Sequence, residues 1–396
     1  MRMRHTATPT PQPLPGAGCN LMHSKDTEPA APSRPAQRVQ LTYALGTDGA
    51  QKPVHHPLFA LLGALHDGGS ISATAKSLSL SYRHVWGELR RWELQFGHPL
   101  VVWNKGQRAQ LTPFGEKLLW AERRAQARLA PQIEALRMEL ERAFADAFDD
   151  RIDVLSISAS HDQALPLLRG LALAGQLHLD LEFTGSLDAL RALDSGRCQL
   201  AGFHVHDGAA RGSVSARAYR ARLQPGRHKL IGFAERSQGL MVASGNPLCI
   251  ASLAALQQPG LRWVGRPPGT GTRVLLEELA AQAGLALPAN FELVEPSHVA
   301  SAQAVASGAA DVAFGLEAAA RAAGLGFVPL AKESYFLVTH KSMLELRAMR
   351  RLIALLRSPE WQQTLARLPG YGCAAEPGAV LALTRVLPWW SYRHAH

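Results

Sequence analysis

Two groups of side chains in the sequence of 396 residues have the types and the spacing that binding sites use. One group lies in residues 70–93, SISATAKSLSLSYRHVWGELRRWE, where hydroxyl, aromatic and basic side chains follow a short turn. The other group occupies three short loops: SASH at 158–161, TGS at 184–186 and GTGTR at 269–273. Basic and aromatic side chains on a helix suit nucleic acid, and hydroxyl groups at helix starts suit a small anion.

Helices between residues 56 and 96 would present the first group. Four leucines at helical spacing between residues 58 and 65 predict a short helix that ends at Gly68-Gly69. A second helix starts at Ser70, and a third runs from about Tyr82 to Phe96 after the turn at 79–81. The sequence therefore predicts a helix, a turn and a further helix, which is the geometry that places the last helix in the major groove of DNA.

The start of the third helix supplies the candidate DNA contacts. Arg83 can bond guanine in a bidentate manner, Tyr82 or His84 can contact a base or a phosphate, and basic residues farther along suit the backbone. The predicted DNA-binding residues are Ser81, Tyr82, Arg83, His84, Arg90, Arg91, Lys105 and Arg108. Residues 52–112 carry a local net charge of +4, which favours this prediction. The alternative is a solvated, arginine-rich face.

A wing and a long helix are expected next. Two short apolar pieces, 100–103 and 109–111, are joined by a basic loop and predict a two-stranded wing. Thr112 as N-cap and Pro113 at the first helical position then open a helix that runs to about Phe144 or Phe148. Its apolar stripe consists of Leu118, Leu119, Ala125, Leu129, Ile133, Leu136, Leu140 and Phe144. This stripe predicts dimerisation, and the alternative is that the helix packs on its own domain.

From Arg151 onward, short β-rich runs alternate with helical segments rich in Ala, Leu and Arg. This alternation predicts an α/β domain with largely parallel sheets. The rhythm changes at two successive strands, 229–235 and 239–243, so we expect two lobes with a ligand site in the cleft between them.

The three hydroxyl-bearing loops fall at the starts of helices in this domain. A helix start offers free N–H groups and partial positive charge, which suit phosphate, sulfate or molybdate, and Arg273 could add a charge-assisted bond. The glycines do not match G-x-G-x-x-G, and no lysine stands where a P-loop needs one. Each loop taken alone could also be simple helix capping.

The residues of the first group resemble a known family. Residues 70–96, followed by HPLV at 98–101 and QLTPFGEKLL at 110–119, resemble the winged helix of the LysR type, and most closely the branch found in molybdate-responsive ModE-type regulators. The resemblance covers about residues 52–145. It implies a homodimer, possibly a tetramer, that reads a roughly palindromic double-stranded DNA operator.

Residues 151–371 resemble the periplasmic-binding-protein-like domain that is fused to such winged helices and also ends some molybdopterin-synthesis proteins. The runs that carry the resemblance are SHDQAL (160–165), GSLDALRAL (185–193), LAGFHV (200–205), QPGRHKLIGFAERSQGL (224–240), GTGTRVLLEEL (269–279) and SHVASAQAVASGAADVAFGLEAAA (297–320). In that family two lobes close on a ligand, and the domain is often described as molybdate-binding.

The resemblance also suggests the ligand-binding residues. Those on the matching cleft loops are Ser160, His161, Ser186, Arg236, Thr270, Thr272, Arg273, His298 and Glu317. The small β-barrel module with which ModE-type regulators bind molybdate has no counterpart in this sequence. Molybdate, tungstate, another oxyanion and a metabolite related to the molybdenum cofactor therefore stay open as ligands.

The fold class we predict is multidomain: an α+β winged helix-turn-helix with a long linker helix, then an α/β two-lobed type-2 periplasmic-binding-protein-like domain. The predicted parts are a disordered tail (1–38), the DNA-binding domain (39–112), the linker and dimerisation helix (113–148), the effector domain (151–371) and a C-terminal tail (372–396) with an exposed aromatic patch at 387–392.

Composition supports a regulator in the cytoplasm. The net charge is +10, the four cysteines form no C-x-x-C pair, and no apolar run is long enough to span a membrane. His204, His206 and Asp207 are near one another, but alternate strand residues face opposite ways, so we expect no metal site and no cofactor. The rival interpretation is an enzyme that uses Glu317 or His161 as acid or base on a small anion, although no nucleophile has an adjacent base.

Overall fold

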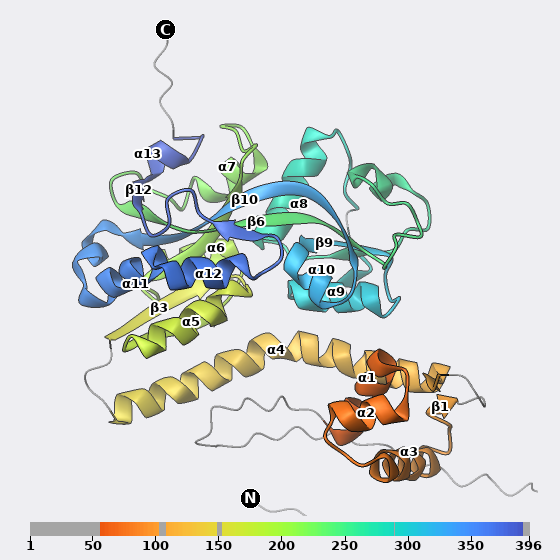
Figure 1. The fold of residues 1–396 in the computed structure, drawn as a ribbon. Helices are drawn as coiled ribbons and strands as arrows, with labels where there is room; N and C mark the ends of the chain where they lie inside the picture. The colour runs from red at the N-terminus through yellow and green to blue at the C-terminus, as the bar shows by residue number, and fades with distance from the viewer. Residues whose placement is uncertain (1–55, 103–107, 149–152, 289, 391–396) are drawn as a thin grey trace, which may run out of the picture. The chain divides into compact units, whose positions relative to one another are not determined.

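The computed structural model describes residues 56–102, 108–148, 153–288 and 290–390 (Figure 1). Within these ranges no helix combines the length and the apolar character that a membrane span requires. The predicted tail at 1–38, the start of the predicted DNA-binding domain and Lys105 lie outside the described residues.

Three short helices form the helix-turn-helix, and their bounds agree with the predicted ones. They are α1 (Pro57–Gly68), α2 (Ile71–Ser77) and α3 (Tyr82–Phe96). The hydroxyl groups of Ser70 and Ser81 cap α2 and α3, because they accept hydrogen bonds from the backbone N–H groups of Ala73 (3.0 Å) and His84 (3.1 Å). All four leucines of the predicted stripe in α1 are buried.

The wing consists of β1 (Val101–Val102) and β2 (Gln110–Leu111), which pair antiparallel as predicted. The buried carboxylate of Glu93 accepts hydrogen bonds from the backbone N–H groups of Leu100 (2.8 Å) and Val101 (3.2 Å). Glu93 therefore fixes the end of α3 to the first strand of the wing.

The long helix α4 runs over Pro113–Phe148, as the sequence predicts. Thr112 Oγ1 accepts a hydrogen bond from the backbone N–H of Gly115 at 3.0 Å, which is the expected N-cap. Leu119 is buried in the winged-helix core, whereas Leu129, Ile133 and Leu136 are 37%, 45% and 51% exposed. Part of the predicted apolar stripe is thus exposed to solvent on the single chain. Dimerisation through this stripe stays a prediction.

The predicted effector domain is built on one mixed sheet whose strand order is β4-β3-β5-β10-β6-β9-β7-β8. Its first part contains β3 (Asp153–Ala159), β4 (Leu177–Phe183) and β5 (Leu200–His206), with α5 (Ala164–Ala174), α6 (Ser186–Asp194) and α7 (Val214–Tyr219). Its second part contains β7 (Trp263–Gly265), β8 (Leu293–Val294) and β9 (Val312–Leu316), with η1 (Leu253–Gln257), α8 (Gly271–Gln282), α9 (His298–Ala306) and α10 (Glu317–Ala322).

Two long antiparallel strands connect these parts: β6 (His228–Val242) and β10 (Gly326–His340). Figure 1 shows them crossing the middle of the domain. We call residues 153–236 and 333–390 the first lobe and residues 237–332 the second lobe. The prediction of two separate strands within 229–243 is wrong, because β6 continues through its polar residues Arg236 and Gln238, which are buried.

The prediction of largely parallel sheets holds only within each lobe. Strands β3, β4 and β5 pair in parallel, and so do β7, β8 and β9. The pairs β5–β10, β10–β6 and β6–β9 are antiparallel. The long strands β6 and β10 thus join two parallel sheets into one.

The chain ends with η2 (Lys341–Glu345), α11 (Arg347–Arg357), α12 (Pro359–Ala366), β11 (Tyr371–Cys373), β12 (Val380–Ala382) and α13 (Leu383–Val386). Both β11 and β12 pair with β6, so the prediction of a tail from residue 372 is wrong. The prediction of an exposed aromatic patch is also wrong for Leu387 and Trp389, which are 1% and 0% exposed. Their burial in the core of the first lobe makes residues 372–390 part of the effector domain.

Candidate functional site

The start of α3 presents the predicted DNA contacts to solvent. Ser81, Tyr82, Arg83 and His84 are all exposed, and Tyr82 is 55% exposed. Val85 and Leu89, on the opposite face, are buried and anchor the helix in the winged-helix core. Arg83 makes no hydrogen bond or ion pair with another described residue. The surface needed for reading bases is therefore open.

Arg90 and Arg91 are held by their own helix. Arg90 forms an ion pair with Glu93 at 2.9 Å and lies over the Trp86 ring at 5.3 Å. Arg91 pairs with Glu88 at 2.6 Å. Both arginines remain exposed, as does Arg108 beside the wing, so their predicted contact with phosphates stays a prediction.

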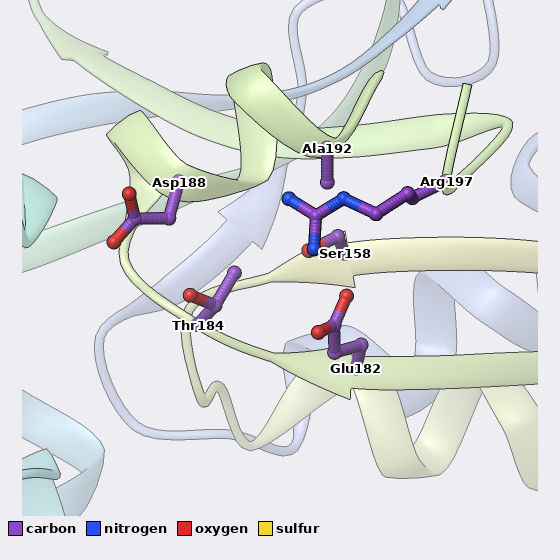
Figure 2. A pocket seen from close by; sticks show the side chains of 6 residues that line it. All are labelled: Ser158, Glu182, Thr184, Asp188, Ala192 and Arg197. Carbon is purple, nitrogen blue, oxygen red and sulfur yellow. The ribbon is translucent and has the colours of Figure 1, made fainter. Parts of the chain in front are cut away.

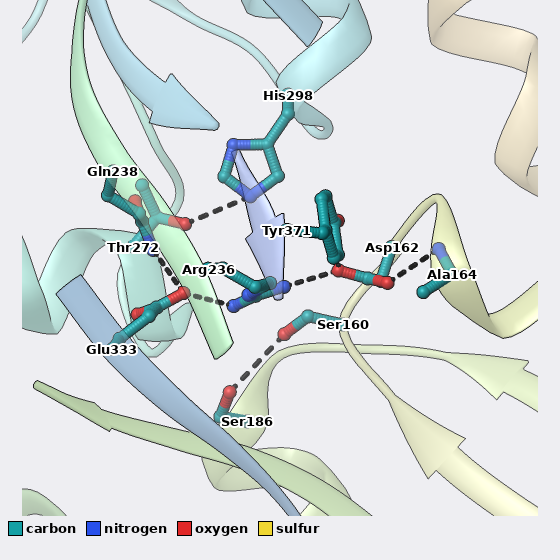
Figure 3. Close-up of polar contacts among 10 residues, drawn as sticks. All are labelled: Ser160, Asp162, Ala164, Ser186, Arg236, Gln238, Thr272, His298, Glu333 and Tyr371. Carbon is teal, nitrogen blue, oxygen red and sulfur yellow. Dashed lines mark hydrogen bonds and ion pairs between the residues drawn. The ribbon is translucent and has the colours of Figure 1, made fainter. Parts of the chain in front are cut away.

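A buried ion cluster lies where β6 and β10 pass from one lobe to the other (Figure 3). The guanidinium of Arg236 donates to the carboxylates of Asp162 and Glu333. Gln238 Nε2 donates to Glu333 Oε1 at 2.8 Å, and the Tyr371 hydroxyl donates to Asp162 Oδ2 at 2.7 Å. Residues 162, 236, 238 and 333 are at most 2% exposed, so water does not screen these bonds.

The charges of the cluster persist despite burial. Burial lowers the pKa of Arg236, but Glu333 and Asp162 outweigh it, and the pKa lies above its usual range. Burial raises the pKa of Glu333, but Arg236 outweighs this effect and the pKa is lowered overall. Arg236 and Glu333 therefore stay ionised at neutral pH.

Four of the predicted ligand-binding residues lie in two hydrogen-bonded pairs beside this cluster (Figure 3). In the first lobe, Ser160 Oγ and Ser186 Oγ are 3.3 Å apart, and Ser186 is the first residue of α6. In the second lobe, Thr272 Oγ1 and His298 Nε2 are 3.2 Å apart, and His298 is the first residue of α9. The starts of α6, α8 and α9 thus bring buried polar groups to one place from both lobes.

The remaining predicted ligand residues lie elsewhere or serve the fold. Arg273 is turned away, because its Nε donates to Glu277 at 2.6 Å and its guanidinium lies 4.9 Å from the Phe291 ring. Thr270 caps α8. Glu317 accepts a hydrogen bond from Arg321 Nη2 at 3.1 Å. The His161 ring packs on Phe183, and burial lowers the pKa of His161.

The sequence did not predict four members of the cluster, Asp162, Gln238, Glu333 and Tyr371, or the nearby buried Arg266, and it considered the buried His204 only as a metal ligand. In the sequence, single charged residues such as Asp162 and Glu333 indicate positions on the surface. A signal was available for Gln238, because a polar residue interrupts an apolar strand there. Arg266 donates to the Glu295 carbonyl at 2.7 Å, and burial lowers the pKa of Arg266 to about 10.

A cavity of about 250 Å³ lies in the first lobe, beside the predicted loops at 158–161 and 184–186 (Figure 2). It is lined by Ser158, Glu182, Thr184, Asp188, Ala192 and Arg197. None of the nine predicted ligand-binding residues is among them. The cavity is therefore separate from the Arg236 cluster.

Two family models match the chain. The model "Bacterial regulatory helix-turn-helix protein, lysR family" matches residues 58–116, which hold α1 to β2 and the first turn of α4. The model "PBP superfamily domain" matches residues 170–357, which hold most of both lobes.

One curated relative and several solved structures are similar to this chain. "Uncharacterized protein YvgK" of Bacillus subtilis is 31% identical over 192 residues, which make up 48% of this chain and 61% of that protein. Full-length mutant BenM is 16% identical, with a TM-score of 0.40 over 78% of this chain and 95% of BenM. CbnR, a LysR family transcriptional regulator, is 19% identical, with a TM-score of 0.38 over 76% of this chain and 99% of CbnR.

The chain spans about three fifths of the length of YvgK (61%). The residues that the two family models match coincide with two structural parts described above. One model covers the helix-turn-helix with the exposed α3, and the other covers most of the two-lobed sheet. The chain thus combines a helix-turn-helix domain that matches the lysR family model with a domain that matches the PBP superfamily model.

Proposed function

We propose that the protein is a cytoplasmic homodimer that binds a double-stranded DNA operator and changes its operator affinity when a small ligand binds between the two lobes. The exposed start of α3 is the observation that carries the DNA-binding part. Ser81, Tyr82, Arg83 and His84 face solvent on a helix whose other face is anchored in the winged-helix core. In a winged helix this is the region that meets base edges.

Dimerisation through α4 would set the spacing of the two recognition helices. Leu129, Ile133 and Leu136 lie on α4 at spacings of four and three residues, and all three are more than one third exposed. A second copy of α4 would cover them. Two symmetric copies of α3 then read two half-sites of a palindrome.

The ligand part rests on the polar groups at the starts of α6, α8 and α9. Ser160, Ser186, Thr272 and His298 are buried, and they come from both lobes, so a ligand that contacts them favours the closed arrangement of the lobes. The family resemblance suggests molybdate, tungstate or a molecule related to the molybdenum cofactor. A coupling free energy of about 1 to 3 kcal/mol between ligand and DNA is enough for regulation.

The test is selective DNA binding by the full-length protein. Operator-like sequences are enriched from randomised duplex DNA with the wild-type protein, and their affinity is then compared with that of random duplex DNA. The variant Arg83→Ala should lose at least about fivefold in this specificity ratio, since a bidentate base contact contributes about 1 to 3 kcal/mol. Arg350→Ala is the matched control, because Arg350 is an exposed arginine of α11.

Two results would contradict the proposal. The wild-type protein could fail to enrich any sequence, or Arg83→Ala could weaken binding equally on enriched and random DNA. The second result would mark Arg83 as a phosphate contact that carries no sequence information.

A further inference from the structure

Several buried polar atoms around the Arg236 cluster have no hydrogen-bond partner among the described residues. They include both ring nitrogens of His204, Oε1 of Gln238, Nδ1 of His298 and the hydroxyl of Tyr335. His204 is 4% exposed and Gln238 is 0% exposed. A buried polar atom without a partner destabilises the native state, and native proteins retain few of them. The partner of each of these atoms is therefore a bound ligand or an ordered water molecule.

His204 differs from other buried histidines of the same lobe. His206, two residues farther along β5, accepts a hydrogen bond at Nδ1 from the backbone N–H of Gly208 at 3.0 Å. His228 accepts one at Nδ1 from the backbone N–H of Gln224, also at 3.0 Å. His206 and His228 each have a role in fixing a turn, whereas His204 has no such bond among the described residues.

The position of His204 connects it to the candidate ligand site. It stands opposite Tyr335 in the β5–β10 pair, and the two rings meet edge to face at 5.3 Å. The guanidinium of Arg236 lies over the same Tyr335 ring at 4.6 Å. Nε2 of His204 faces Gly271, which directly precedes Thr272. His204 thus borders the ion cluster on one side and the start of α8 on the other.

The charges in this region balance one another. Arg236, Arg266 and Arg128 supply three positive charges, and Asp162, Glu333 and Glu295 supply three negative ones. Burial lowers the pKa of His204 to about 4 and lowers the pKa of His298 well below its usual value, so both rings are neutral. A ligand with two negative charges would find no net positive side-chain charge here.

The unpartnered atoms also define which hydrogen bonds are missing. A neutral imidazole carries one N–H donor and one acceptor nitrogen, and Oε1 of Gln238 is an acceptor. Nε2 of Gln238 already donates to Glu333, so its amide orientation is fixed. A fully deprotonated tetrahedral oxyanion has only acceptors and leaves Oε1 of Gln238 and the acceptor nitrogen of His204 unpaired.

We infer that the ligand is a small organic molecule that carries N–H or O–H donors as well as acceptors and at most one negative charge, and that His204 and Gln238 contact it directly. The inference rests on the proposed ligand-responsive function and selects an organic ligand over bare molybdate or tungstate. The acceptor groups of the ligand would meet Ser186, Thr272 and the N–H of His204, and its donors would meet Gln238.

The first measurement compares the stability of two variants in the absence of added ligand. His204→Leu removes two unpartnered nitrogens, whereas the matched control His206→Leu on the same strand removes one bonded nitrogen, Nδ1, and one unpartnered nitrogen, Nε2. We expect the urea midpoint of His204→Leu to equal or exceed that of the wild type and that of His206→Leu to fall. A fall for His204→Leu as large as that for His206→Leu would overturn the inference, because His204 would then serve the fold.

The second measurement is thermal unfolding of the wild-type protein with millimolar molybdate, tungstate, sulfate or phosphate. We expect no selective rise in Tm with molybdate or tungstate. A selective rise that disappears in Thr272→Ala would overturn the inference and identify an oxyanion ligand. Neither measurement depends on DNA, and His204→Leu should keep the wild-type specificity ratio for enriched DNA, so failure of the DNA-binding proposal is recognised separately.

Discussion

His204 and Gly271 lie so close together that a methyl group on residue 271 would stand 2.0 Å from Nε2 of His204. His204 belongs to β5 of the first lobe, and Gly271 is the first residue of α8 in the second lobe. The lobes touch at this point, and only a residue without a side chain fits between them.

Gly271→Ala should therefore weaken the closed arrangement. The added methyl group has to displace the ring of His204 or the start of α8, and overpacking of this kind costs about 1 to 3 kcal/mol. Gly170→Ala in α5 is the control, because a methyl group there meets no atom within 4 Å and alanine favours a helix by up to about 1 kcal/mol. Urea unfolding followed by circular dichroism measures the stability of both variants. Equal midpoints for Gly271→Ala and Gly170→Ala would contradict the close contact.

Arg236 should be the most sensitive residue of the ion cluster. Arg236→Met leaves the buried carboxylates of Asp162 and Glu333 without their cation, and breaking a buried pair in this way costs about 3 to 5 kcal/mol. Glu333→Gln keeps the ion pair between Arg236 and Asp162, so this variant should lose less stability than Arg236→Met. The triple variant Arg236→Met, Asp162→Asn, Glu333→Gln should recover stability relative to Arg236→Met, and a triple variant less stable than Arg236→Met would show that the unpaired buried charges are not the cause.

The hydroxyl of Tyr371 should stabilise the attachment of the C-terminal strands. It donates to Asp162 at 2.7 Å, so Tyr371→Phe leaves one carboxylate oxygen with fewer donors and should cost about 1 to 3 kcal/mol. Tyr335→Phe is the matched control, because the buried Tyr335 hydroxyl has no partner among the described residues and its removal should not lower stability. Equal losses in the two variants would argue against the bond to Asp162.

His204 should also make stability depend on pH. Burial lowers the pKa of His204 to about 4 in the folded protein, whereas an unfolded histidine titrates near 6.5. Between these values the unfolded chain binds more protons, so the free energy of unfolding falls as the pH decreases from about 6.5 to about 4. The slope from one histidine is at most about 1.4 kcal/mol per pH unit.

The variant His204→Leu isolates this contribution. Its free energy of unfolding should decrease less steeply between pH 6.5 and 4 than that of the wild type, and the two profiles should run parallel above pH 6.5. Urea unfolding at a series of pH values measures the difference. Parallel profiles over the whole range would mean that His204 is protonated in the folded state as easily as in the unfolded one.

The helix-turn-helix could be predicted because its signals are local. Ser81 caps the start of α3, and Gly97 ends it with a left-handed backbone conformation, so both bounds follow from neighbouring residues. The start of α4 likewise follows from Thr112 and Pro113. These capping interactions join residues at most four positions apart, which sequence patterns record directly.

The long strands and the ion cluster could not be predicted in the same way. Arg236 pairs with Asp162 and Glu333, which lie 74 and 97 residues away along the chain. Each charge alone resembles a surface residue, and only the pairing allows all three to be buried. The positions of Ser186 and Thr272 at helix starts could be predicted because helix starts are visible in sequence, whereas the C-terminal strands were missed because their partner, β6, lies far upstream.

The shared strands β6 and β10 also determine the order in which the protein can be completed during synthesis. The winged-helix core comes from one continuous stretch of chain and can form early, since its contacts are local. Val205 of β5 cannot pair until Ser334 of β10 has been synthesised. The edge of β6 likewise stays unpaired until β11 and β12 have been synthesised. A chain released before residue 334 would therefore carry a finished winged-helix core and an open sheet edge, which is a site for aggregation.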